Sequence, residues 1–187
     1  MSAARKLKRS LPGDKIADSI DSMIRVDHAG EYGAKRIYEG QLAVLGKDAK
    51  LKKIIEHMAA QEQVHLDFFA KEIVARKVRP TALHPLWHVT GYALGAITAK
   101  MGAEAAMACT VAVETVIAEH YQNQLHALKN NPREKKLRDA IKKFKAEEEE
   151  HHDICIDHNA EHATAYPLLI KVIKIGAKLA IEVAKRV

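Results

Sequence analysis

Two short motifs in this sequence place a glutamate three residues before a histidine: Glu62 and His65 in EQVH, and Glu148 and His151 in EEEH. Residues three apart on an α-helix lie on the same face, so each pair could hold one metal ion. A single motif of this kind on a charged helix is more often part of a solvated surface. The chemistry therefore depends on whether the helices turn these side chains inward.

The second motif lies in the run EEEEHH, residues 147–152, which also offers the overlapping pairs 147/150 and 149/152. Steps of three and four residues join Glu148 and His151 to a largely apolar line that also contains Leu137, Ile141, Phe144, Cys155 and His158. The neighbouring line is charged and contains Arg138, Lys142, Lys145, Glu149 and His152. A regular helix therefore turns the pair Glu148/His151 into the core.

The other predicted ligands also interrupt apolar stripes. Glu62 and His65 share theirs with Leu51, Ile55, Met58 and Phe69, and Glu31 and Glu114 each occur singly in such a stripe. A buried glutamate is costly unless it is paired, hydrogen-bonded or metal-bound. Four glutamates and two histidines that project inward from four helices could satisfy one another through two divalent ions. Hard carboxylates with one imidazole per metal favour iron or manganese over structural zinc.

The elements that must position these residues are long helices. Helical periodicity covers residues 15–45, 48–77, 89–129, 132–159 and 167–187, with Gly91, Gly95 and Gly102 as candidate breaks and residues 80–88 as a connection. The single glutamate precedes the Glu-x-x-His glutamate by 31 residues in the first half and by 34 in the second. We therefore predict two helical hairpins that form an all-α antiparallel four-helix bundle with additional hydrophobic or amphipathic helices.

The composition fits one helical domain, residues 15–187, after a flexible basic arm at residues 1–14. A net charge of +6 suits an anionic membrane surface or a nucleic acid equally well. Cys109 and Cys155 have no CxxC spacing, so we expect buried, reduced thiols rather than a disulfide. The arm lacks the apolar core of a secretory signal.

Several segments resemble the demethoxyubiquinone hydroxylase family, the ferritin-like di-iron monooxygenases of ubiquinone biosynthesis. The segments are MIRVDHAGEYGAKRIYEGQLAVLG (23–46), AAQEQVHL (59–66), VRPTALHPLWHVTGYALGA (78–96), AMACTVAVE (106–114) and EEEEHHDICIDHNAE (147–161). The likeness covers residues 21–187, and RVDHAGEYGA is far more specific than either Glu-x-x-His motif. The resemblance implies a ferritin-like bundle whose metal ligands are Glu31, Glu62, His65, Glu114, Glu148 and His151.

The resemblance also implies an activity: O2-dependent hydroxylation of the bare ring carbon of a demethoxyubiquinone or demethoxyubiquinol, with two iron ions as cofactor. The substrates are a polyprenyl quinone and O2. No flavin or dinucleotide fingerprint occurs, so electrons come from an external donor, for which NADH is the candidate. Glu31 and Glu114 would each complete one metal's shell while Glu62 and Glu148 could bridge, although the sequence leaves the bridging carboxylates open.

Three further residues are candidates for a role next to the ligands. Asp27 and His28 lie one helical turn before Glu31, and Tyr121 lies two turns after Glu114. Each could orient a ligand histidine or shuttle protons, and each could equally be an ordinary hydrogen-bonded core residue. Glycines at positions 30, 33 and 40 of the first helix indicate either close helix approach or room for a substrate.

A polyprenyl substrate predicts contact with a membrane surface. Residues 83–99 are nearly uncharged but too short to span, so they could lie in the interface with Trp87 and Tyr92 at headgroup level. The last helix is basic and amphipathic, with one stripe of Lys171, Lys174, Lys178 and Lys185. It could lie on anionic lipid or simply pack on the core.

The expected location is peripheral. The short arm favours a bacterial protein on the cytoplasmic face of the inner membrane, or a trimmed eukaryotic protein on the matrix side of the mitochondrial inner membrane. A lipid-binding partner protein of the ubiquinone pathway and self-association into a homo-oligomer are further expectations.

Two rival functions use the same features differently. A ferritin-like iron-storage or peroxide-scavenging protein has a similar ligand set and would hold many irons per chain. The arm sequence RKLKR suits nucleic acid, but six inward ligands have no role there, and we expect no nucleic-acid binding.

Overall fold

The structure, a computed structural model, describes residues 19–187, and these form six α-helices and two short 3₁₀ turns without a β-strand. The helices are α1 (Ile20–Leu45), α2 (Ala49–Arg76), α3 (His84–Lys100), α4 (Ala103–Leu128), α5 (Lys135–Asp157) and α6 (Tyr166–Ala184). The turns are η1 (Pro132–Glu134) and η2 (Ala160–His162). The prediction of an all-α bundle with additional helices is confirmed, while the basic arm predicted at residues 1–14 lies outside the described residues.

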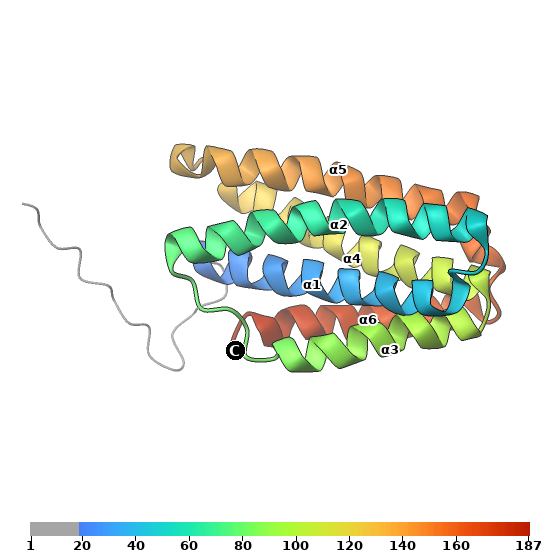
Figure 1. Cartoon of the computed structure of the whole chain (residues 1–187). Coiled ribbons are helices and arrows are strands. Elements are labelled where there is room, and N and C mark those ends of the chain that lie inside the picture. Colours follow the sequence, from blue (N-terminus) through green and yellow to red (C-terminus); the bar gives the residue numbers. More distant parts are fainter. Residues whose placement is uncertain (1–18) are drawn as a thin grey trace, which may run out of the picture.

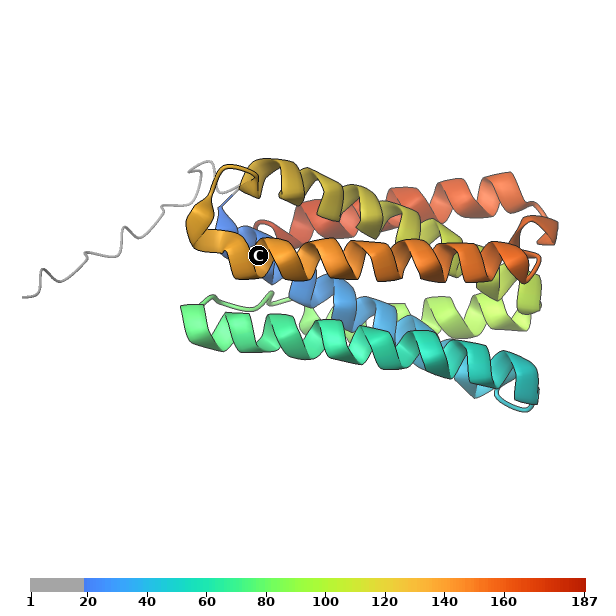
Figure 2. The same cartoon turned by 90° about the horizontal axis from the view of Figure 1, so that it is seen from above.

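Successive helices run in opposite directions and stack in three layers of two (Figure 1). Helices α2 and α5 form one outer layer, α1 and α4 the middle layer, and α3 and α6 the other outer layer. Helix α1 packs against α2 and α3, whereas α4 packs against α5 and α6. The view from above shows the same pairing, with α2 and α5 antiparallel to each other (Figure 2). The four-helix bundle therefore consists of α1, α2, α4 and α5.

The helix predicted over residues 89–129 is in fact two antiparallel helices, α3 and α4. The break falls at Gly102, whose φ of 127° is a left-handed value that glycine adopts without a steric penalty. The connection predicted at residues 80–88 is also shorter than expected, because α3 already begins at His84 with Pro85 in its first turn. Likewise, Pro132 opens the turn η1 and α5 begins only at Lys135.

Side-chain caps fix the starts of the first hairpin's helices. The Ser19 hydroxyl accepts a hydrogen bond from the Ser22 amide at 3.1 Å. The Asp48 carboxylate accepts bonds from the amides of Lys50 and Leu51 at 2.8 and 3.0 Å. Such caps satisfy amides that have no partner inside the helix, so they set the residue at which each helix starts.

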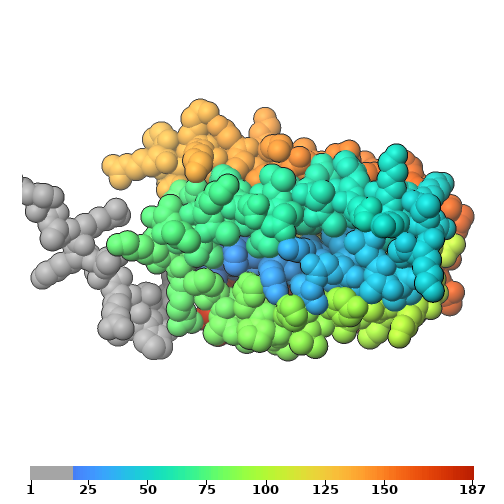
Figure 3. Space-filling model, in the orientation of Figure 1, coloured from blue at the N-terminus to red at the C-terminus, as the bar shows by residue number. Residues whose placement is uncertain are grey.

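Two glycines allow α3 to lie unusually close to α1. A Cβ on Gly95 would overlap the Ile37 carbonyl, and a Cβ on Gly40 would overlap the Tyr92 carbonyl. Close helix approach is therefore the role of Gly40. In the space-filling view, α2 and α3 leave only a strip of α1 visible (Figure 3).

Apolar clusters fill the bundle at both ends. One contains Ile24, Phe69, Leu137, Ile141 and Phe144. The other contains Ile55, Met58, Met107, Val111 and Cys155. The predicted polar ligands lie between these clusters, so close-packed hydrophobic side chains support them from both sides. Within residues 19–187, no helix combines the length and the apolar character needed to cross a bilayer.

Candidate metal centre

All six predicted ligands are buried and meet inside the bundle. Their side chains form two groups, and within each group the candidate ligand atoms lie within 4.8 Å of one another. The first ligand group contains Glu31, Glu62, His65 and Glu148. The second ligand group contains Glu62, Glu114, Glu148 and His151. Each group contains three carboxylates and one imidazole. The groups share Glu62 and Glu148, one from each Glu-x-x-His motif. These two carboxylates could therefore contact both of two neighbouring metal ions.

The structure resolves the run EEEEHH as helical periodicity predicts. Glu148 and His151 are fully buried, whereas Glu149 is exposed and forms an ion pair with Lys145 at 2.6 Å. His152 is on the outer face and lies 2.9 Å from Asp153. The predicted inward orientation of Glu148 and His151 is therefore confirmed, while their role as metal ligands stays a prediction.

Several buried polar atoms of the cluster suit a cation. Both carboxylate oxygens of Glu62, Oε2 of Glu114 and Nδ1 of His151 have no hydrogen-bond partner among the described residues. Buried polar atoms without partners destabilise a protein unless something else satisfies them. Two divalent ions would do so, and the set of four carboxylates and two imidazoles suits iron or manganese.

Burial and neighbouring negative charges shift the pKa values of the clustered carboxylates. Burial, followed by the negative charges of Glu148 and Glu31, raises the pKa of Glu62 well above its usual range. Burial and then Glu148 likewise raise the pKa of Glu114. Burial raises the pKa of Glu31, but His65 together with hydrogen bonds from Glu62 and Tyr121 outweighs burial, so the pKa is lowered. Metal-free protein must therefore hold protons that metal ions would displace.

His65 and His151 differ in charge. Burial lowers the pKa of His65, but Glu148 at 3.2 Å and Glu31 at 3.3 Å outweigh it and raise the pKa to about 11. Burial lowers the pKa of His151, which is therefore a neutral imidazole. In both residues Nδ1 faces the cluster, since it is the nitrogen that lies within 3.4 Å of glutamates of the ligand groups.

Two buried tyrosines hold the glutamates that the groups do not share. The Tyr38 hydroxyl donates to Glu114 Oε1 at 2.8 Å, and the Tyr121 hydroxyl donates to Glu31 Oε1. Burial and then the nearest carboxylate, Glu114 or Glu31, raise the pKa of each phenol, so both remain donors. Tyr121 therefore contacts a ligand, although it orients a glutamate rather than a histidine.

Asp27 and His28 are placed elsewhere. Asp27 Oδ1 accepts a hydrogen bond from Gln124 at 2.7 Å and lies 3.2 Å from His120. His28 packs beside His84, with ring centroids 5.6 Å apart. Neither residue contacts His65 or His151, whose Nε2 atoms lie against Glu147 and Gln61. A role of Asp27 or His28 beside the metal centre stays a prediction.

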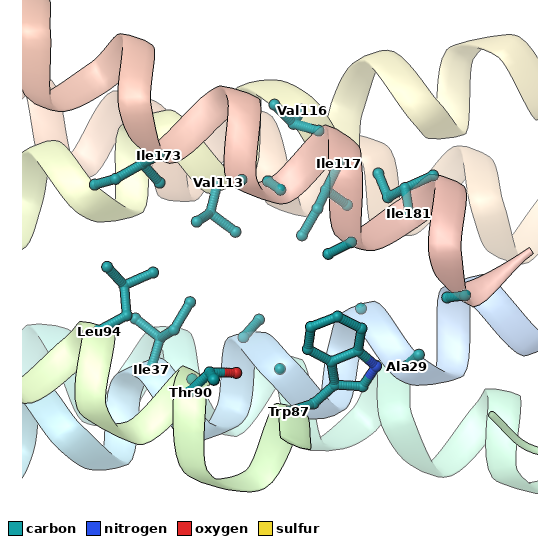
Figure 4. Close-up of a pocket in the computed structure, with 18 of the residues that line it drawn as sticks. Ala29, Ile37, Trp87, Thr90, Leu94, Val113, Val116, Ile117, Ile173 and Ile181 are labelled. Atoms are coloured by element: carbon teal, nitrogen blue, oxygen red, sulfur yellow. The ribbon is translucent and has the colours of Figure 1, made fainter. Parts of the chain in front are cut away.

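An apolar cavity of about 420 Å³ lies on the other side of α1 and α4 from the bundle interior. Helices α1, α3, α4 and α6 line it, and side chains from the two pairs of helices face each other across it (Figure 4). The labelled lining residues are Ala29, Ile37, Trp87, Thr90, Leu94, Val113, Val116, Ile117, Ile173 and Ile181. A Cβ on Gly30, Gly33 or Gly176 would meet no described atom within 4 Å, so these glycines leave room in the cavity.

The chain matches the family model described as "Ubiquinone biosynthesis protein COQ7" over residues 18–184. The chain belongs to this family. Its helices accordingly form a ferritin-like fold, in which α3 and α6 are the additional helices. The six predicted ligands lie on the four helices of the bundle.

Curated relatives share about half of the residues of this COQ7 family member. A Bos taurus protein named NADPH-dependent 3-demethoxyubiquinone 3-hydroxylase, mitochondrial, is 53% identical over 171 residues, which are 90% of this chain and 78% of the relative. A Rhodospirillum rubrum protein named 3-demethoxyubiquinol 3-hydroxylase is 52% identical over 178 residues, covering 95% and 83%. A Saccharomyces cerevisiae protein named 5-demethoxyubiquinone hydroxylase, mitochondrial, is 41% identical, covering 93% and 81%.

Three residues that hold the predicted ligands were not anticipated from the sequence. The first is Tyr38, which donates a hydrogen bond to Glu114. His65 Nε2–H donates to Glu147 Oε2 at 2.9 Å, and Gln61 Oε1 accepts from His151 Nε2–H at 2.9 Å. A signal existed, because Gln61 and Glu147 each directly precede the glutamate of a Glu-x-x-His motif, and Tyr38 follows Glu31 as Tyr121 follows Glu114.

Proposed function

We propose that this chain is an O2-dependent di-iron hydroxylase that hydroxylates the ring of a demethoxyubiquinone or demethoxyubiquinol late in ubiquinone biosynthesis. Membership of the COQ7 family and the hydroxylase names of relatives at 41–53% identity support this function. The observation that carries it is a buried cluster of six predicted ligands in a bundle whose helices α1 and α4 also line an apolar cavity. When bound, two iron ions would supply the redox chemistry with O2 that side chains lack.

The ligand groups assign a role to each residue. Glu31 and His65 would hold one ion, and Glu114 and His151 the other, with Glu62 and Glu148 reaching both. Tyr38 and Tyr121 fix the carboxylates of the two terminal glutamates by hydrogen bonds. The apolar clusters at both ends keep bulk water away from the centre, which strengthens every electrostatic interaction inside it.

The cavity suits the polyprenyl chain of the substrate. Its walls are aliphatic apart from the Trp87 ring and Thr90, whose hydroxyl already donates to the Leu86 carbonyl at 2.8 Å. Gly176→Leu would fill the space that the glycine leaves, so we expect kcat/KM for a prenylated substrate to fall about tenfold or more with unchanged iron content. Thr164→Leu, an exposed residue outside the cavity, is the matched control. Equal activity of the two variants would contradict the proposal that the polyprenyl chain occupies this cavity.

The outer layer of α3 and α6 is the surface we propose for membrane contact. Exposed apolar residues on α6 recur at helical spacing: Leu168, Val172, Ile175 and Leu179. Those on α3 are Leu86, Val89, Tyr92 and Ile97. Both helices line the cavity, so a lipid substrate could pass from the bilayer into it.

Vesicle sedimentation tests this surface. The double variant Val172→Asp/Leu179→Asp should lose most of its binding to vesicles of mixed neutral and anionic phospholipid. The control Val64→Asp/Val74→Asp changes equally exposed apolar residues on α2, in the opposite outer layer, and should bind normally. If both double variants lose binding equally, α3 and α6 are not the contact surface.

The reductant is an external nicotinamide nucleotide in this proposal. The sequence-based candidate was NADH, whereas several relatives carry NADPH in their names. We therefore expect turnover with NADPH to equal or exceed turnover with NADH. Lipid delivery by a separate binding protein and self-association of the chain stay predictions drawn from the resemblance.

A turnover assay tests the function itself. Iron-loaded protein in detergent is supplied with a short-chain demethoxyubiquinone, NADPH and ¹⁸O2, and the product is analysed by mass spectrometry. We expect one ¹⁸O atom in the ring hydroxyl. Uptake of many irons per chain with peroxide consumption and no hydroxylated quinone would favour the storage or scavenging alternative instead.

A further inference from the structure

The two ligand histidines are held by chemically different partners. His65 donates through Nε2–H to the Glu147 carboxylate, and His151 donates through Nε2–H to the Gln61 amide oxygen, both at 2.9 Å. These contacts cross between the antiparallel helices α2 and α5, one helical turn apart. The two ligand groups otherwise have the same composition, since each contains three glutamates and one histidine, and a tyrosine holds one of the glutamates.

The difference in hydrogen-bond acceptor changes how basic each histidine is at the nitrogen that faces the metal position. A carboxylate that accepts the distal N–H of a metal-bound imidazole raises the basicity of the nitrogen that faces the metal, and loss of such a partner weakens binding by about 10- to 100-fold. A neutral amide fixes the ring orientation but withdraws the proton less. Glu147 retains 19% side-chain exposure and also lies 3.4 Å from Lys143. That lysine is 63% exposed, so water screens its charge, whereas His65 is fully buried against Glu147.

We propose that Glu147 and Gln61 make the two metal positions unequal, so that the ion beside His65 is bound more tightly than the ion beside His151. The inference rests on the proposed metal centre. Glu147 and Gln61 act through the histidines and are positioning residues. The difference between the carboxylate of Glu147 and the amide of Gln61 thus sets the order in which the two metal positions fill.

Anaerobic titration of metal-free protein with Co²⁺ tests the inequality, because d–d absorption and heat of binding report each position. Wild type should show two phases. Glu147→Gln should weaken the tighter phase about tenfold and bring the two together. Gln61→Glu should tighten the weaker phase, and the double exchange Glu147→Gln/Gln61→Glu should restore two phases. One-equivalent ⁵⁷Fe Mössbauer spectra should show one dominant doublet in wild type and a mixture in Glu147→Gln.

The control is Glu149→Gln, which removes the same charge from the exposed side of α5. The inference is overturned if Glu147→Gln binds Co²⁺ like this control, or if both phases weaken equally. Gln61→Glu keeps the test decisive if Glu147→Gln fails to fold, because the inference requires it to tighten one phase only. Wild type that binds fewer than two ions would instead contradict the metal centre and the proposed function.

Discussion

The α1–α2 and α4–α5 hairpins contribute matched sets of side chains to the same cluster. Each brings one glutamate, a tyrosine seven residues later, and a Glu-x-x-His motif on its second helix. Among the side chains that hydrogen-bond the predicted ligands, the hairpins differ in residue type at one position, where Gln61 of the first corresponds to Glu147 of the second. A repeated pattern therefore builds the site, and this difference changes how its two histidines are held.

The contacts between the halves are crossed. Tyr38 holds Glu114 and Tyr121 holds Glu31, while Gln61 holds His151 and Glu147 holds His65. Neither hairpin can therefore orient its own ligands alone. The cluster forms only when the hairpins pack together, which couples its geometry to the whole bundle.

The largest expected effect on activity comes from removing a glutamate that belongs to only one of the two ligand groups. Glu31→Ala and Glu114→Ala each remove a glutamate that belongs to one ligand group only. Each variant should keep about one ion per chain and lose hydroxylation by about 10³-fold or more, because both ions are needed. Glu119→Ala, an exposed residue of α4 that pairs with Lys178, is the control. Loss of both ions in either variant would refute the assignment of separate groups.

Metal affinity should depend steeply on pH. Burial and neighbouring carboxylates raise the pKa values of Glu62, Glu114 and Glu148, so these groups hold protons that a metal must displace. Affinity should rise with pH by about tenfold per pH unit for each proton released. Co²⁺ titration between about pH 6 and about pH 8, in buffers of different ionisation heat, counts those protons. An affinity that does not change with pH would contradict the raised pKa values.

The tyrosines offer a smaller and more selective test of the crossed contacts. Tyr38→Phe should weaken the second ligand group, and Tyr121→Phe the first, each by about tenfold, because each leaves a ligand carboxylate without its donor. Tyr32→Phe is the control, since that hydroxyl bonds His88 between α1 and α3. If both variants weakened the same Co²⁺ phase, the crossed arrangement would be wrong.

The smallest effect concerns stability without metal. Glu62 has a raised pKa in the folded protein, so it binds a proton there that the unfolded chain releases near neutral pH, and stability falls as pH rises through this range. Glu62→Gln should therefore increase the free energy of unfolding of metal-free protein by about 1 kcal/mol or more near pH 7 and abolish metal binding. The gain should vanish below the ordinary glutamate pKa. Thermal unfolding of metal-free wild type and Glu62→Gln measures this difference in stability. Glu149→Gln is the control and should unfold much like wild type.

Periodicity in the sequence was enough to select the six residues that the structure brings together in one buried cluster. A glutamate within an apolar helical stripe is a strong signal, because burial without compensation is so unfavourable, and six such residues on four stripes leave few alternatives. The same reasoning chose 148/151 within EEEEHH. Periodicity could not predict the cavity, because a space between four helices depends on how they pack rather than on any one segment.

The residues that sequence analysis missed share a physical reason. Glu147 and Gln61 lie off the apolar stripes, and only the antiparallel packing of α2 on α5 brings them to the histidines. Asp27 and His28 were chosen by proximity along α1, yet they contact other helices. The break between α3 and α4 was one of three candidate glycines, and only the backbone conformation identifies Gly102.

The most direct test of the account is iron content and its Mössbauer spectrum in purified wild type and in Glu148→Ala, with Glu149→Ala as the control on the outer face of α5. Glu148 belongs to both ligand groups, so the account predicts about two coupled irons per chain in wild type and in the control, and loss of both in Glu148→Ala. A well-folded, iron-replete wild type with less than about one iron per chain, unchanged by Glu148→Ala, would contradict the di-iron centre and the hydroxylase with it.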